Sequence, residues 1–135
     1  MQRIIVGFDG SPTAQRALDR AIELAKRFEA PLTVLTVADD HLVREDGVVT
    51  LAVDEALASR IAEEGAEQAR LVGVREVEAR TAMGAPAEVL AEAGQGADTW
   101  LVVGHRGLSG LRELFLGGVA KRVVDHAGCT VLVVR

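Results

Sequence analysis

Residues 3–12 read Arg3-Ile4-Ile5-Val6-Gly7-Phe8-Asp9-Gly10-Ser11-Pro12, and this stretch decides the fold. Its apolar part is short, β-branched and nearly continuous, which is typical of a strand buried on both faces of a parallel sheet. Ser11 can cap a helix, and Pro12 fits the first helical position, where a missing N–H costs nothing. The stretch therefore predicts a buried strand that leads directly into a helix, as at the start of an α/β fold.

The same alternation of strand and helix patterns continues to the end of the chain. The predicted strands are residues 3–8, 32–37, 74–81, 100–103 and 130–134, and the predicted helices are residues 12–28, 51–71, 87–93 and 119–126. Residues 74–81 alternate apolar with charged side chains, which indicates an exposed edge strand. Residues 39–50 are polar and acidic and predict a loop. We expect one α/β domain, residues 1–135, with a mostly parallel sheet.

Composition excludes several classes of protein. The chain has 135 residues, of which 49% are hydrophobic and 26% charged, enough apolar material for a sizeable core. The net charge of −5 argues against a nucleic-acid partner. No apolar run approaches the ~18 residues of a membrane span, and the early Asp9 argues against a signal peptide. The single cysteine, Cys129, excludes an internal disulfide and suits a reducing compartment, so we expect a cytoplasmic protein.

Glycines gather after the fourth predicted strand. Residues 104–110 read Gly104-His105-Arg106-Gly107-Leu108-Ser109-Gly110, and Gly117-Gly118 opens the next helix. Glycines let the backbone approach a ligand closely, and a helix N-terminus suits a phosphate. Ligands of open α/β sheets lie outside the carboxyl ends of the strands, so Asp9 and Gly104 are both candidates for that rim. The alternative interpretation is that these glycines only serve turns.

These motifs, together with Gly84-x-Pro86-Ala87-Glu88 and the closing residues 127–134, resemble the universal stress protein family over essentially the whole chain. The resemblance implies an open five-stranded parallel sheet flanked by four helices, which is Rossmann-like and similar to the adenine nucleotide alpha hydrolases. It also implies a homodimer that pairs through the C-terminal strand, Thr130 to Val134. In the nucleotide-binding branch of the family, ATP lies in the crevice between the first and fourth strands.

The resemblance also assigns expected roles to individual residues. Asp9 is expected to contact the ribose, while Gly7 and Phe8 lie along the adenosine. Val37 is expected to meet the adenine through its backbone. The phosphates are expected to lie among Gly104, Arg106, Gly107 and Gly117, with N–H groups from Gly118 and Val119. The sequence does not say whether Mg²⁺ accompanies the ligand, although a triphosphate usually brings it.

Gly118 departs from the pattern, because the nucleotide-binding branch usually has Ser or Thr there. A hydrogen bond to a charged group contributes ~1.5–3 kcal/mol, so its loss weakens ATP binding by roughly tenfold to a hundredfold. We still expect a nucleotide-responsive stress-response module. No catalytic or metal-binding constellation is visible, so we expect at most slow ATP hydrolysis. The alternatives are a dimeric interaction or chaperone-like protein that binds no nucleotide, and a small enzyme acting on phosphorylated metabolites.

Overall fold

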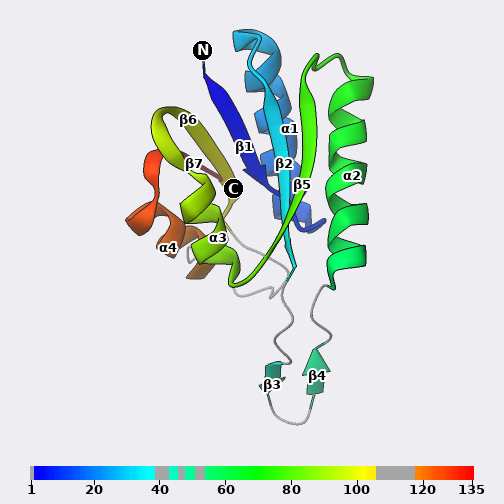
Figure 1. The fold of residues 1–135 in the computed structure, drawn as a ribbon, viewed down its shortest axis with the longest axis vertical. Coiled ribbons are helices and arrows are strands. Elements are labelled where there is room, and N and C mark those ends of the chain that lie inside the picture. The colour runs from blue at the N-terminus through cyan, green and yellow to red at the C-terminus, as the bar shows by residue number, and fades with distance from the viewer. Residues whose placement is uncertain (1, 39–42, 46–47, 51–53, 106–117) are drawn as a thin grey trace.

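The computed structural model describes residues 2–38, 43–45, 48–50, 54–105 and 118–135. Strands and helices alternate along most of the chain (Figure 1). In order they are β1 (Arg3–Gly7), α1 (Pro12–Phe28), β2 (Leu32–Ala38), β3 (Val43–Glu45), β4 (Val48–Thr50), α2 (Glu55–Leu71), β5 (Val77–Met83), α3 (Pro86–Ala93), β6 (Gln95–Gly104), α4 (Gly118–His126) and β7 (Gly128–Val134).

The main sheet has five strands in the order β5-β2-β1-β6-β7, and all neighbouring pairs run parallel. From β1 the chain builds outward through β2 to β5, and then continues on the other side through β6 to β7 (Figure 1). This confirms the predicted α/β fold with its open parallel sheet. β5 lies at one edge, as its alternating pattern predicted, and the C-terminal strand β7 lies at the other.

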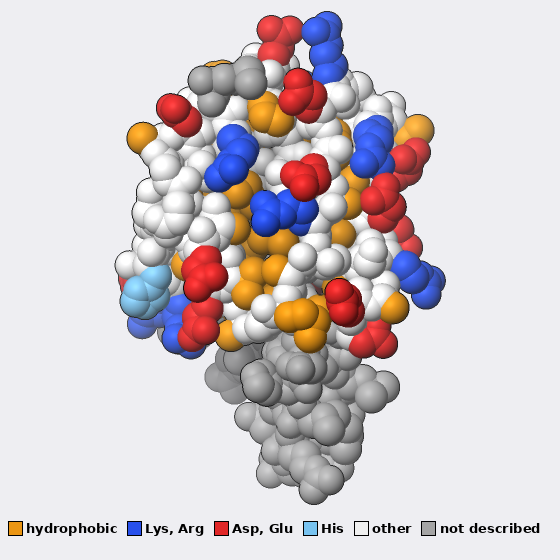
Figure 2. Space-filling view, in the orientation of Figure 1, with side chains coloured by type: hydrophobic (Ala, Val, Ile, Leu, Met, Phe, Trp, Pro, Cys, Tyr) orange, Lys and Arg blue, Asp and Glu red, His pale blue; other side chains and the backbone are white. Residues whose placement is uncertain are grey.

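Two helices cover each face of the sheet. Ile4 and Val6 of β1 pack with α1 and α2 in one core, while Ile5 packs with α3 and α4 in the other. Successive side chains of β1 thus pack alternately in the two cores, as expected for a strand buried on both faces. On the face turned to the viewer in Figure 2, acidic and basic side chains are interspersed around hydrophobic ones. The described side chains of that face form no basic field of the kind that attracts a polyanion.

Side-chain caps fix where the first two long helices begin. The Ser11 hydroxyl accepts a hydrogen bond from the Ala14 N–H at 3.2 Å, and Pro12 follows at the first helical position. The Asp54 carboxylate accepts from the Leu57 N–H at 2.7 Å and starts α2. The helix was predicted from Leu51. It begins instead after Asp54, because the aspartate satisfies an N–H group at the helix end.

Two other segments differ from the sequence prediction. Within residues 39–50, predicted as a loop, β3 and β4 form a short antiparallel pair in which Arg44 lies opposite Val49. The β-branched residues of β4 favour a strand despite the acidic surroundings. β6 starts at Gln95, where a helix stop was predicted, and its pairing with β7 shifts register between Gln95 and Trp100.

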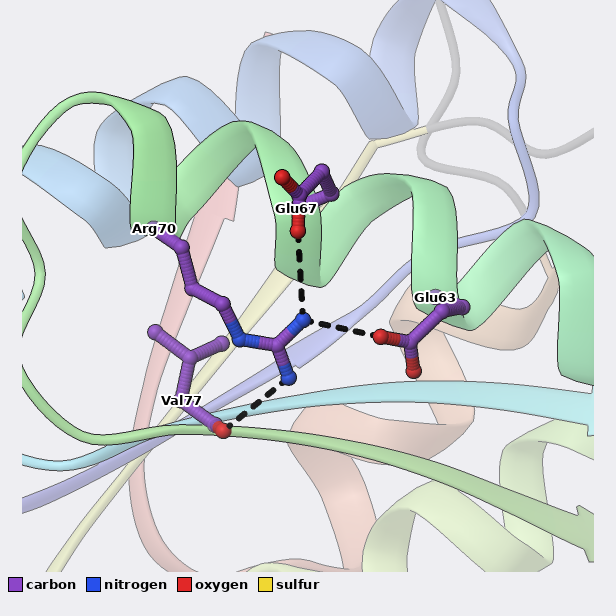
Figure 3. Close-up of polar contacts among 4 residues, drawn as sticks. All are labelled: Glu63, Glu67, Arg70 and Val77. Carbon is purple, nitrogen blue, oxygen red and sulfur yellow. Dashed lines mark hydrogen bonds and ion pairs between the residues drawn. The ribbon is translucent and has the colours of Figure 1, made fainter.

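Arg70 covers the outer edge of β5 (Figure 3). Its guanidinium pairs with Glu63 at 2.8 Å and with Glu67 at 3.5 Å, and its other nitrogen donates to the Val77 carbonyl at 3.4 Å. The hydrogen bond that Arg70 donates to the Glu63 carboxylate raises the pKa of Arg70 above its ordinary value. Since Glu76, next to Val77, bonds inward to Leu32 of β2, the Val77 carbonyl faces outward. Arg70 therefore occupies an edge carbonyl to which another strand could otherwise bind.

Candidate functional site

The carboxyl ends of three neighbouring strands meet at one rim of the sheet. β1 ends at Gly7, and its neighbours β2 and β6 end at Ala38 and Gly104. The strand that follows β1 in the chain, β2, pairs on one side of it, and the strand that follows β6, β7, lies on the opposite side. A crevice is therefore expected between β1 and β6. The structure thereby brings Gly7, Asp9, Val37 and Gly104 to the same rim.

The backbone of Val37 faces this crevice. In a parallel sheet, successive residues direct their N–H and C=O groups alternately to the two neighbouring strands. Leu35 bonds toward β1, because its carbonyl accepts from the Phe8 N–H at 2.9 Å, whereas Ala38 accepts from Gly84 on the side of β5 at 3.0 Å. Val37 therefore directs both backbone groups to the side of β1, beyond the last pair in the register, Gly7 with Leu35.

Gly104 faces the same crevice from the opposite side. The N–H of His105 donates to the Val134 carbonyl on β7 at 2.8 Å, so alternation turns the backbone groups of Gly104 toward β1. The register between β1 and β6 has already ended at Val6 with Val102. The strands on either side of β1 thus both present backbone groups above its end.

Gly104 also needs to be a glycine for packing. A Cβ atom there would lie 3.0 Å from the backbone of Thr13, in the first turn of α1. A Cβ on Gly7 would similarly meet Leu90 of α3 at 3.0 Å. These two glycines let helices pack against the rim from both faces of the sheet.

Asp9 lies in the turn that joins β1 to α1. Its carboxylate accepts a hydrogen bond from the Ser11 N–H at 2.9 Å, and Gly10 adopts a φ of 81°, which favours glycine. Ser11 then caps α1. The turn holds a partly exposed carboxylate at the rim, where it can accept hydrogen bonds from hydroxyl groups of a ligand.

Phe8 points away from the rim. Its ring is buried in the core under α2, where a Cβ on Gly65 would lie 2.9 Å from it. Its carbonyl accepts from the Thr36 hydroxyl at 2.7 Å. Thr36 was not identified from the sequence. The available signal was a polar residue in a strand that is otherwise mostly apolar, on the same face as Val34 and Leu32.

Gly118 and Val119 form the first turn of α4, and both are exposed. α4 connects the parallel strands β6 and β7, so it runs back along the sheet and its N-terminus lies at the end where β6 finishes. No atom approaches a Cβ built on Gly118 within 4 Å among the residues that the structure describes. The predicted phosphate-site residues Arg106, Gly107 and Gly117 lie outside the described residues.

His105 is buried directly after Gly104. Its Nδ1 atom has no hydrogen-bond partner within the described ranges, although its backbone N–H bonds to β7. Cys129 is half-buried beside Gly94, and its thiol donates to the Thr130 carbonyl at 3.4 Å. Burial raises the pKa of this thiol, so it is mostly protonated at neutral pH.

Two shallow hollows lie elsewhere. One, of about 250 Å³, is lined by α3, α4 and Gln95, and includes Glu88 and Arg122, which form an ion pair at 3.8 Å. The other, of about 380 Å³, is lined by α1 and Val72. Neither is lined by a rim residue. None of the helices in the described ranges is long and apolar enough to cross a membrane.

Comparison with known proteins agrees with this architecture. Residues 1–135 match the universal stress protein family. Universal stress protein YxiE of Bacillus subtilis (strain 168) is 34% identical over 146 residues, covering 98% of both chains. A solved universal stress protein in complex with cAMP is 28% identical, with a TM-score of 0.73, over 99% of this chain and 97% of that one. A universal stress protein of Archaeoglobus fulgidus in complex with dAMP shares the fold, with a TM-score of 0.75 and 21% identity over 100% and 98% of the two chains.

Proposed function

Because this chain belongs to the universal stress protein family, we propose that it binds an adenine nucleotide, ATP, in the crevice between β1 and β6. The observation that carries the proposal is the orientation of Val37 and Gly104. Both direct backbone groups to the side of β1, beyond the end of its ladder. A relative of 28% identity was solved with cAMP, which supports an adenine nucleotide as the ligand class.

The base would lie against Val37. A backbone N–H beside a C=O offers one donor and one acceptor on the same edge. Adenine complements this pair, because its amino group donates and an adjacent ring nitrogen accepts. The sugar would lie beside Asp9, whose carboxylate can accept hydrogen bonds from hydroxyl groups.

The phosphates would extend from Gly104 to the start of α4. The unpaired N–H groups of a helix N-terminus and its partial positive charge suit an anion. Gly118 and Val119 are exposed in that first turn. Arg106, Gly107 and Gly117 remain part of the proposed phosphate site on the family resemblance. A triphosphate usually carries Mg²⁺, which would bind mainly to the phosphate oxygens.

We further propose that the protein works by binding rather than by catalysis. Fast phosphoryl transfer needs a positioned metal and an oriented nucleophile. Among the residues that the structure describes, the rim offers backbone groups and the carboxylate of Asp9, which fit binding and orientation. We expect ATP turnover well below the ~1 s⁻¹ of dedicated enzymes.

A homodimer through β7 belongs to the same proposal. β7 is an edge strand, and its outward backbone groups can pair with a second copy. The opposite edge, β5, carries Arg70 on its Val77 carbonyl and charged side chains at Glu78 and Arg80. Pairing at β7 is therefore favoured over pairing at β5.

Titration calorimetry with ATP, GTP and ADP tests the nucleotide proposal. We expect saturable binding of ATP at millimolar concentration or below, and weaker binding of GTP. Asp9→Asn is the matched variant. Its amide oxygen can still accept the hydrogen bond from the Ser11 N–H, but the negative charge of the Asp9 carboxylate is lost. Absence of saturable ATP binding to the wild-type protein would contradict the proposal.

The alternative is an interaction protein that binds no nucleotide. Gly118 favours it, because this residue lacks the hydroxyl found in the nucleotide-binding branch. Mass spectrometry of the purified protein separates the two functions. A co-purifying adenine nucleotide supports binding, whereas a ligand-free protein that also fails the titration supports the alternative.

A further inference from the structure

The hydroxyl of Thr36 fills a position in the sheet that a backbone N–H usually fills. The Phe8 N–H donates to the Leu35 carbonyl. In a regular parallel pair, the next hydrogen bond runs back to the Phe8 carbonyl from the N–H of Val37, two residues after Leu35. Here the Thr36 hydroxyl donates to that carbonyl at 2.7 Å, and Thr36 is only 1% exposed. The β1–β2 register accordingly stops at Gly7 with Leu35.

We propose that Thr36 is a positioning residue that keeps the Val37 N–H available for the base of a bound nucleotide. This inference rests on the proposed function and adds one residue to it. A buried carbonyl needs a hydrogen-bond donor. Since the Thr36 hydroxyl already donates to the Phe8 carbonyl, the hydrogen-bond ladder between β1 and β2 does not have to include the Val37 N–H. Closing it would turn the Val37 N–H away from a ligand and into the sheet.

The proposal makes Thr36 a determinant of base selectivity. With its N–H available, Val37 offers a donor and an acceptor side by side, which complements adenine. Guanine presents a carbonyl oxygen where adenine presents an amino group, so it does not fit the same pair. Losing the N–H should therefore remove most of the preference for adenine, while leaving phosphate binding intact.

A purely structural role for Thr36 makes a different prediction. Phe8 directly precedes Asp9, so the same hydrogen bond also steadies the turn at the rim. If that were its only role, losing the hydroxyl would weaken the contact with the sugar and leave the preference between bases unchanged. The ratio of ATP to GTP affinity separates the two roles.

The binding experiment compares Thr36→Val, which keeps the shape and removes the hydroxyl, with Thr36→Ser, which keeps the hydroxyl. We expect Thr36→Val to weaken ATP binding about tenfold, the value of one net hydrogen bond. GTP and inorganic tripolyphosphate should bind as they do to the wild type. Thr36→Ser should restore ATP binding. Thr33→Val is the matched control, because Thr33 is also buried in β2 but pairs regularly with Ile5.

Equal weakening of ATP, GTP and tripolyphosphate in Thr36→Val would overturn the proposal. So would a Thr36→Ser protein that binds ATP as weakly as Thr36→Val does.

A second measurement needs no ligand. Amide hydrogen exchange, followed residue by residue by NMR, reports whether the Val37 N–H is hydrogen-bonded. We expect fast exchange at Val37 in the ligand-free wild type and in Thr36→Ser, and slow exchange in Thr36→Val, where the ladder closes. A protected Val37 amide in the ligand-free wild type would refute the proposal, even if Thr36→Val failed to fold. Failure of ATP binding alone would instead refute the proposed function.

Discussion

Gly104 and Thr13 lie so close that a Cβ atom on Gly104 would be 3.0 Å from both the carbonyl carbon and the carbonyl oxygen of Thr13. The end of β6 thus packs directly on the first turn of α1. That turn also carries the cap from Ser11, whose N–H holds the Asp9 carboxylate. The contact between the two elements therefore fixes the end of β6 relative to the turn that carries Asp9.

Gly104→Ala tests this contact. A backbone neighbour cannot move aside cheaply, so we expect the free energy of unfolding to fall by about 1–3 kcal/mol. Urea denaturation followed by Trp100 fluorescence measures the loss. Gly118→Ala is the control: it meets no described atom within 4 Å, so the free energy should stay equal or rise by up to ~1 kcal/mol. Equal stability of both variants would mean that α1 shifts easily.

Gly118→Ser should strengthen ATP binding by about tenfold. The new hydroxyl adds a charge-assisted hydrogen bond to phosphate, and none of the described residues comes within 4 Å of a Cβ atom on Gly118. Calorimetric titration measures the change, with Gly118→Ala as the control that adds a side chain but no hydroxyl. If Ser and Ala bind ATP alike, the phosphates do not reach the start of α4.

Gly65→Ala should destabilise the protein through Phe8. The added methyl group would lie 2.9 Å from the Phe8 ring and 3.0 Å from Val34. Overpacking costs about 1–3 kcal/mol and outweighs the ~1 kcal/mol that alanine gains over glycine in a helix. We expect a lower urea midpoint than in the wild type. Glu64→Ala, at an exposed neighbouring position of α2, should change the midpoint little. If it lowered the midpoint as much as Gly65→Ala does, the cause would be a change in the helix and not the contact with the Phe8 ring.

Val131→Pro tests pairing through β7. The Val134 carbonyl bonds inward to β6, so alternation turns the backbone of Val131 to the outer edge. Proline there removes an outward N–H while sparing the ladder with β6. Sedimentation should show a dimer for the wild type and for Val131→Ala, and a monomer for Val131→Pro. A wild-type monomer at micromolar concentration would contradict the proposed dimer.

Cys129 should react slowly with thiol reagents at neutral pH. Burial raises the pKa of its thiol, so the reactive thiolate is scarcer than in an ordinary cysteine. The labelling rate should increase with pH and approach that of the urea-unfolded chain only above the raised pKa of the folded thiol. The neutral thiol also favours the folded state at lower pH, and this contribution declines as the pH rises through the raised pKa. Equal labelling rates for the folded and unfolded chains at pH 7 would contradict this expectation.

The strands themselves were predictable from features that are local in the sequence. Continuous apolar runs such as residues 4–6 marked the buried strands, and the alternating run near Val77 marked an edge. The start of α2 was placed too early, because helical spacing extends past the residue whose side chain caps the helix. The β3–β4 pair was missed because an acidic composition says little about the pairing of β-branched neighbours.

The rim residues were less predictable than the strands. The spacing of the glycines predicted Gly104 as a site residue. Its packing against Thr13 is a second reason for a glycine at this position, and no local sequence pattern indicates it. The place of Phe8 along the adenosine stays a prediction, and the sequence did not indicate that its ring is buried beside Gly65. Thr36 could not be found by motif, because its importance depends on where the β1–β2 register ends.

The guanidinium of Arg70 occupies the Val77 carbonyl, one of the outward backbone groups of the β5 edge. If two copies join through β7, the outermost strand at each end of the combined sheet is a β5 with its arginine already in place. In such a dimer, each occupied carbonyl is one fewer backbone group to which the strand of a third molecule could bind, which disfavours growth into a fibre. A single cation on one helix can in this way hinder strand pairing at the edge of a neighbouring sheet strand.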